Sequence, residues 1–215
     1  MSNMEHQKDQ LDAIKDIRSM MERSSRFLSL SGLAGIVVGL IAIAGVIVAY
    51  QFLGLQFNEP GYYTRIINPD GSLNHTVYQF LLTELILLLI VALVVAITLS
   101  MRKASAKALP IWDTTAKRLV INMAVPLVAG AILCCILLFH GHVALILPTT
   151  ILFYGLAIFN ASKYTLHDIR SLGVIEILLG LIAAFYVDYA LLFWALGFGV
   201  LHIAYGLYIY FKYEK

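Results

Sequence analysis

Six apolar stretches alternate with polar segments along the chain, and their lengths are the first strong signal in the sequence. Most of them approach the ~20 residues that an α-helix needs to cross the hydrocarbon core of a bilayer. Because backbone N–H and C=O groups must be satisfied inside lipid, these stretches are expected to be helical. The pattern predicts six transmembrane helices, over about 27–50, 77–100, 118–139, 143–161, 171–187 and 190–211.

Composition supports an all-α membrane protein. Hydrophobic residues make up 60% of the 215 residues and charged residues 13%, well below the ~25% typical of soluble proteins. One transmembrane domain is expected over 27–215, preceded by a cytoplasmic amphipathic helix within 1–26. Apolar residues recur at helical spacing in 8–26, with mixed charges on the other face. This mixture favours packing on a protein partner, or an extension of the first span, over a helix lying on lipid.

One long loop, 51–76, interrupts the otherwise short connections. It contains the turn sequence Asn68-Pro69-Asp70-Gly71, which is typical of a tight reversal. Residues of alternating character lie on both sides of this turn, over 63–67 and 72–77. The pattern predicts a small extracytoplasmic β-hairpin.

Lysine and arginine predict the orientation. Of the 15 basic residues, only Arg65 falls in a segment assigned to the outer side. The positive-inside rule therefore places both termini in the cytoplasm. No basic stripe lies outside the membrane flanks, so the expected partner is the lipid bilayer and not nucleic acid. The sequence leaves the oligomeric state open.

A repeat runs through the chain. An arginine followed 10–13 residues later by glycine and an apolar run occurs three times, at Arg26, Arg118 and Arg170. Each repeat covers two spans, so the predicted fold is three αα-hairpins.

Small residues predict where helices approach closely. Ser31, Gly35 and Gly39 recur every four residues in the first span, and such faces allow close packing in lipid. Contact with another helix of the same chain is favoured over homodimerisation.

The last hairpin carries two further glycine faces. If the chain reverses around Asp188, Gly173 is expected beside Gly206. By the same geometry, Gly180 is expected beside Gly199.

Two ionisable residues of the last hairpin lie at one predicted depth. Glu176 and His202 are about 20 Å from the turn, at 1.5 Å per residue. Buried acids and histidines in membranes are functional candidates, so the pair is either a proton or ligand site or a hydrogen-bonded structural pair. The structural interpretation is favoured. Glu84, in the second span, has no partner that the sequence identifies: it reaches outward, meets Arg65 or His75 of the long loop, or faces a vestibule shared with another helix.

Other polar residues give weaker signals. Asn122 and Asn160 are equidistant from the turn between the third and fourth spans and are expected to bond to each other. His140 and His142, in that turn, are weak metal candidates, because a His-x-His turn alone is more often solvated. No cofactor is expected: His202 is the one histidine inside a span, whereas haem needs paired ligands.

The segments RSLGVIEILLGLIAAF and LLFWALGFGVLHIAYGLYIYFK, with the tandem hairpins, resemble uncharacterised six-helix bacterial inner-membrane proteins. The chain is more distantly similar to the acid-resistance membrane protein family, which has the same hairpin repeat. The resemblance covers about 115–212. It implies a six-helix fold in the bacterial inner membrane and no catalytic motif.

The leading functional hypothesis is a non-enzymatic inner-membrane protein, either an accessory or stress-related module or the membrane subunit of a larger assembly. The rival is a small transporter or proton-coupled channel that uses Glu84, Glu176 and His202. A third possibility, an enzyme acting on lipid, would need grouped acids and a metal.

Overall fold

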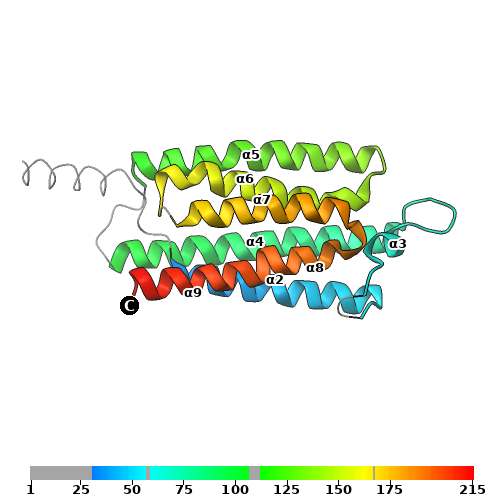
Figure 1. Cartoon of the computed structure of the whole chain (residues 1–215), viewed down its shortest axis with the longest axis horizontal. Helices are drawn as coiled ribbons and strands as arrows, with labels where there is room; N and C mark the ends of the chain where they lie inside the picture. Colours follow the sequence, from blue (N-terminus) through cyan, green and yellow to red (C-terminus); the bar gives the residue numbers. More distant parts are fainter. Residues whose placement is uncertain (1–30, 57–58, 107–111, 167) are drawn as a thin grey trace, which may run out of the picture.

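A computed structural model describes residues 31–56, 59–106, 112–166 and 168–215, and in these segments the regular structure is helical. The helix predicted over 8–26 lies outside the described residues. The long helices run side by side, with the short helix α3 at the opposite end from the C-terminus (Figure 1). The α-helices are α2 (Gly32–Leu53), α3 (Tyr62–Ile66), α4 (His75–Ala106), α5 (Thr114–Phe139), α6 (Ile146–Ala161), α7 (Ile169–Phe185), α8 (Ala190–Trp194) and α9 (His202–Tyr213). Shorter elements are the 3₁₀ helices η1 (Val143–Leu145), η2 (Ser162–Tyr164) and η3 (Val187–Tyr189), and the π-helix η4 (Ala195–Leu201).

Five helical segments of the described chain are long and apolar enough to cross a membrane. This property confirms the predicted class, an all-α protein with membrane-type helices. The remaining long helix, α7, has 17 residues. The five segments are Gly32–Leu53, His75–Ala106, Thr114–Phe139, Val143–Tyr164 and Val187–Tyr213.

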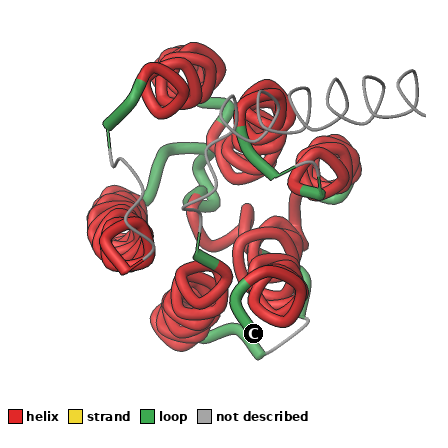
Figure 2. The backbone as a smooth tube through the Cα atoms, turned by 90° about the vertical axis from the view of Figure 1, so that its left-hand side faces the viewer, coloured by secondary structure: helices red, strands yellow, loops and turns green. Residues whose placement is uncertain are grey.

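Viewed end-on, the long helices form an incomplete ring (Figure 2). Helix α2 packs on α4 at one side and on η4 and α9 at the other, while α6 packs between α5 and α7. The ring is open between α4 and α5, which pack on each other far less than the neighbouring pairs α2–α4 and α5–α6 do. Helix α4 is correspondingly exposed, and Ala104 is its one buried residue.

Glycines bring the backbone of α2 against η4 and α9. A Cβ atom added at Gly39 would lie 2.7 Å from the carbonyl oxygen of Gly199. One added at Gly206 would lie 2.6 Å from the backbone nitrogen of Ile36, and one at Gly35 would lie 3.1 Å from Cα of Gly206. The Gly35–Gly39 face therefore contacts another helix of the same chain, as the spacing predicted.

The predicted pairing inside the last hairpin is wrong. The glycines of α7 face α6: a Cβ at Gly173 would lie 2.7 Å from the nitrogen of Phe159, and one at Gly180 would lie 2.6 Å from that of Leu152. Gly199 and Gly206 face α2 instead. The prediction assumed that helices joined by a short turn must be the closest pair. A small-residue face packs on any complementary face beside it, and here sequence neighbours are not the closest partners.

The predicted β-hairpin is also largely wrong. Residues 62–66 form α3, and one isolated antiparallel bridge joins Ile67 to Leu73. Gly71, at φ +80°, supplies the turn between the bridged residues. Tyr62 and Ile66 are 5% and 3% exposed, because a helix puts positions i and i+4 on one face. Burial of that face against the bundle selects the helix over the strand.

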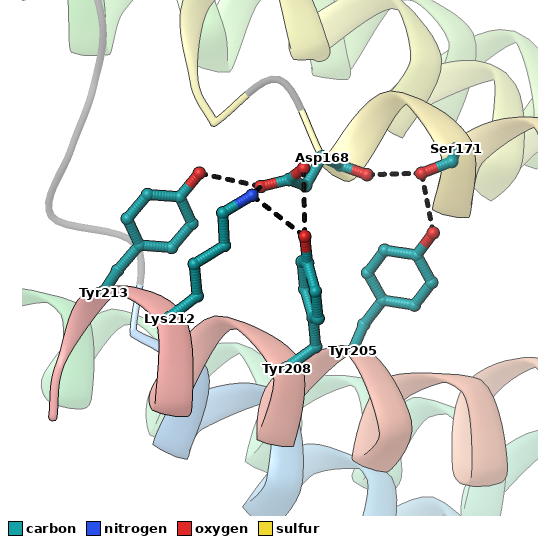
Figure 3. Close-up of polar contacts among 6 residues, drawn as sticks. All are labelled: Asp168, Ser171, Tyr205, Tyr208, Lys212 and Tyr213. Carbon is teal, nitrogen blue, oxygen red and sulfur yellow. Dashed lines mark hydrogen bonds and ion pairs between the residues drawn. The ribbon is translucent and has the colours of Figure 1, made fainter.

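Two carboxylates accept hydrogen bonds that join helices at the C-terminal end of the bundle. Asp168, just before α7, accepts hydrogen bonds from Lys212 (2.8 Å) and from the hydroxyl of Tyr213 (2.7 Å), both on α9. Nearby, the Tyr205 hydroxyl donates to Ser171 at 2.7 Å (Figure 3). The hydrogen bond from Lys212 is the main reason that the pKa of Asp168 lies below its ordinary value.

The second carboxylate, Glu214, connects three parts of the chain. It accepts a hydrogen bond from Lys103 of α4 at 2.9 Å and one from the backbone N–H of Gly32, at the start of α2. Glu214 therefore connects the C-terminal end of the chain to α4 and to the start of α2.

Candidate functional site

Glu176 lies on α7 with its side chain fully enclosed, at 0% exposure. Glycines make room for it on two sides. A Cβ atom at Gly197 of η4 would lie 2.6 Å from Oε2 of Glu176, and one at Gly155 of α6 would lie 2.9 Å from its Cβ. The carboxyl group therefore occupies space that larger residues at these positions would fill.

His202 lies where η4 passes into α9, and both of its ring nitrogens have partners. Nδ1 is 2.9 Å from the carbonyl oxygen of Gly197, and Nε2 is 2.5 Å from the hydroxyl oxygen of Tyr154 on α6. A carbonyl oxygen only accepts, so Nδ1 carries a proton. In the neutral imidazole, Nε2 then accepts the hydroxyl proton of Tyr154. The wider π-helical turn, a feature frequent at functional sites, positions the Gly197 carbonyl for this contact.

The structure brings Glu176 and His202 together without a direct hydrogen bond. Oε1 of Glu176 is 3.8 Å from Nδ1 of His202, too far for that bond. Neither carboxyl oxygen has a hydrogen-bond partner among the described residues. The two side chains are therefore close neighbours, and the direct hydrogen bond considered for this pair is not formed.

The ring of Phe198 packs against this polar cluster, which we define as Glu176, His202 and Tyr154. The ring of Phe198 lies 4.8 Å from that of Tyr154 and 5.8 Å from that of His202, centroid to centroid. Because burying a net charge in such surroundings is costly, the cluster favours states with no net charge. Either the carboxyl group holds a proton beside a neutral imidazole, or the proton lies on the imidazole beside a carboxylate.

The sequence did not identify Tyr154 or Gly197 as members of this cluster. In the sequence, Tyr154 begins a Tyr-Gly-Leu pattern that recurs at Tyr205. The sequence did contain a signal for Tyr154: it directly precedes Gly155, and Gly155 packs against Glu176. Recognising it requires knowing that α6 lies beside α7.

Glu84 lies outside the polar cluster. It is half-buried and lines a cavity of about 330 Å³, together with Trp194 and apolar residues. Neither Glu176 nor His202 lines this cavity. Among the described residues Glu84 makes no hydrogen bond or ion pair, so contact with Arg65 or His75, one of the alternatives left open for it, is not seen there.

The other polar residues predicted from the sequence lie away from the polar cluster and from the cavity at Glu84. The side-chain amide of Asn160 donates to the backbone oxygen of Asn122 at 2.9 Å and is 3.4 Å from its Oδ1, which confirms that expected contact. His140 and His142 are exposed at the turn between α5 and η1. Across the described segments, no group of three or more potential metal ligands forms.

The chain matches no protein-family model, no curated protein and no solved structure.

Proposed function

We propose that the protein is a non-enzymatic integral protein of the bacterial inner membrane, with six spans arranged as three αα-hairpins and both termini in the cytoplasm. Helix α7 would be the sixth span: its 17 residues extend about 26 Å, close to the ~30 Å of the hydrocarbon core. It runs beside α6 over most of its length (Figure 1). The distribution of lysine and arginine supports the orientation, and the hairpin repeat supports the distant likeness to the acid-resistance family.

Within this class, we assign the protein the role of an accessory or stress-related module, or of the membrane subunit of a larger assembly. The observation that carries this assignment is how His202 is held. Its two ring nitrogens contact α6 and η4, beside a Glu176 side chain with no exposed surface. A histidine held in this way joins helices, and this favours a structural role for the polar cluster.

One observation favours the alternative of a proton-coupled transporter or channel. The two oxygens of Glu176 have no donor among the described residues, so this carboxyl group is suited to taking up and releasing a proton. Transport would require a path between the polar cluster and the cavity at Glu84.

The substitution Glu176→Gln distinguishes the two roles. In the structural role, proton flux into proteoliposomes is the same for the variant and the wild type, whereas the melting temperature in detergent falls. The fall is expected because the new amide N–H groups would be buried without acceptors, at about 1–3 kcal/mol.

Glu59→Gln, at an exposed position near α3, is the matched control and should change neither quantity. A wild-type flux that Glu176→Gln abolishes, at unchanged melting temperature, would establish transport and refute the structural role.

A further inference from the structure

The cavity at Glu84 lies inside the ring, on the side where α4 and α5 pack on each other least (Figure 2). Residues of α2, α4, α5, α6 and α8 line it, and its volume is about 330 Å³. On this side Leu82 and Leu89 of α4, and Ala131 and Cys135 of α5, line the cavity and are exposed. In a membrane the opening faces the hydrocarbon chains, so a molecule dissolved in the bilayer reaches the cavity directly.

Glu84 is the one acidic or basic side chain among the described residues that line this cavity. It is half-buried on α4 and makes no hydrogen bond or ion pair in the described part of the chain. Its carboxyl oxygens keep accessible surface, whereas those of Glu176 are enclosed. The cavity therefore offers a carboxyl group that a ligand can touch and that the protein leaves without a counter-charge.

The depth of Glu84 makes the missing counter-charge important. Glu84 lies nine residues beyond the start of α4 at His75, about 14 Å along the helix. Its neighbours one turn away on the same face, Leu81 and Leu88, line the cavity too. In such apolar surroundings a carboxylate needs a positive partner, or it loses its charge by binding a proton. A bound cation would supply that partner.

The rest of the lining does not suit an inorganic cation. Hard metal ions take about six or more oxygen ligands. Apart from Glu84, the lining side chains that carry oxygen are those of Tyr62, Tyr78 and Thr150, and the Thr150 hydroxyl already donates to the carbonyl of Leu147 at 2.7 Å. An inorganic ion would therefore lose its water without gaining enough ligands.

The same lining suits an organic cation with an apolar body. Tyr62, Tyr78 and Trp194 contribute aromatic rings, and the face of such a ring attracts an ammonium group. The leucines of α4 offer apolar surface for the body of the ligand. The volume lies at the lower end of ligand pockets, about 300–1,000 Å³, so the cavity holds one small molecule.

We propose that this cavity binds a lipophilic organic monocation, with its positive group against the carboxylate of Glu84 and its apolar body against the leucines and rings of the lining. The ligand enters from the bilayer between α4 and α5. A neutral acyl chain would leave the carboxylate without a partner, and an anionic lipid would be repelled by it. The site is separate from the polar cluster, so Glu176→Gln tests the proposed function and Glu84→Gln tests this inference.

The fluorescence of Trp194 reports occupation of the cavity. The chain has two tryptophans, and Trp112 is 63% exposed, so Trp112→Phe leaves Trp194 as the single reporter. The probe is N-hexylpyridinium, a slender monocation whose ring quenches indole fluorescence on contact. With the full-length Trp112→Phe protein in nonionic detergent, quenching should saturate, and Glu84→Gln should weaken the affinity at least about tenfold.

Glu59→Gln, which neutralises an exposed acid outside the cavity, is the matched control and should leave the affinity unchanged. The melting temperature of Glu84→Gln should equal that of its parent, because Glu84 has no partner to lose. Weaker quenching then reports the missing charge and not a change of fold. Equal affinity of Glu84→Gln and its parent, or the absence of saturable quenching, would overturn the proposal.

A neutral competitor tests the class of ligand in the parent protein itself. Hexylbenzene has the shape of the probe without its charge, and it should displace the probe at least about tenfold more weakly than unlabelled cation of the same length, hexyltrimethylammonium. Equal displacement by the two competitors would show that the cavity selects an apolar body alone, and would refute the cation site.

A cavity-filling variant tests the location. In the Trp112→Phe background, Ala131→Phe on α5 places a ring in the cavity and should weaken probe binding at least about fivefold. Ala129→Phe is the matched control, because Ala129 is exposed on the same helix and does not line the cavity. Equal affinities in these two variants would place the probe outside the cavity and contradict the proposed site.

Discussion

The α2–α9 pair and the α4–α5 edge both consist largely of apolar residues, yet only the first brings helix backbones into contact. On α2, Gly35 and Gly39 face Gly199 and Gly206, so the main chains approach with little between them. Helix α4 has no glycine over its 32 residues, and it makes few contacts with α5. Lipid tails are as apolar as leucine, so apolar character alone drives no association in a membrane. The comparison indicates that helix backbones come into contact where both facing helices carry glycine, whereas a cavity remains beside α4, which carries none.

The largest effect is expected from placing a large residue between the closely packed backbones. In Gly39→Leu, the side chain would meet the carbonyl oxygen of Gly199, which cannot move aside as a flexible side chain can. We expect a loss of about 3 kcal/mol or more, measured as a lower melting temperature and a lower yield of folded protein in detergent.

Ala44→Leu is the matched control, because Ala44 is exposed on the same helix. Its effect should stay within about 0.5 kcal/mol. Equal losses in the two variants would show that close backbone packing does not distinguish the two regions.

An intermediate effect is expected in the polar cluster. Tyr154→Phe removes the hydroxyl group that bonds to Nε2 of His202, and it leaves that nitrogen buried without a partner. The expected loss is about 1 kcal/mol of unfolding free energy. A double-mutant cycle with His202→Phe should show that the two substitutions are not additive.

Tyr186→Phe, at a site that is 59% exposed, provides the control for removal of a tyrosine hydroxyl and should be neutral. Additive losses for Tyr154 and His202 would argue that the hydrogen bond contributes nothing to holding α6 against α9.

The smallest effect is expected at the C-terminal end, where Asp168 and Lys212 form a partly exposed pair. Such pairs contribute little, so Asp168→Asn should lower the melting temperature by about 1–2 °C at neutral pH. Glu59→Gln, at an exposed position outside this pair, should leave it unchanged.

The pH dependence of this effect has a definite sign. The pKa of Asp168 is lowered in the folded protein, so its stabilising contribution is complete above the ordinary pKa of aspartate. It is lost as the pH falls through the lowered value. Melting curves of Asp168→Asn should therefore depend less on pH in the acid range than those of the wild type, and identical curves would refute the contribution.

The sequence predicted most of what depends on local pattern. Runs of apolar residues specify helices in lipid without reference to the rest of the fold, since each helix satisfies its own backbone. Residues that lie equally far from a short turn come to the same depth on two helices. Asn122 and Asn160 could therefore be paired correctly. The proximity of Glu176 and His202 followed from depth alone.

Only the tertiary structure decided which faces meet. Glycine faces are interchangeable in sequence, so the pattern could not indicate that α7 packs on α6 while α9 packs on α2. Residues 62–66 carry both an alternating and a helical pattern, and burial of Tyr62 and Ile66 selects the helix. Tyr154 and the cavity at Trp194 likewise depend on helices distant in sequence. Local hydrogen bonding forms the individual helices, whereas their arrangement depends on contacts between surfaces that no single segment contains.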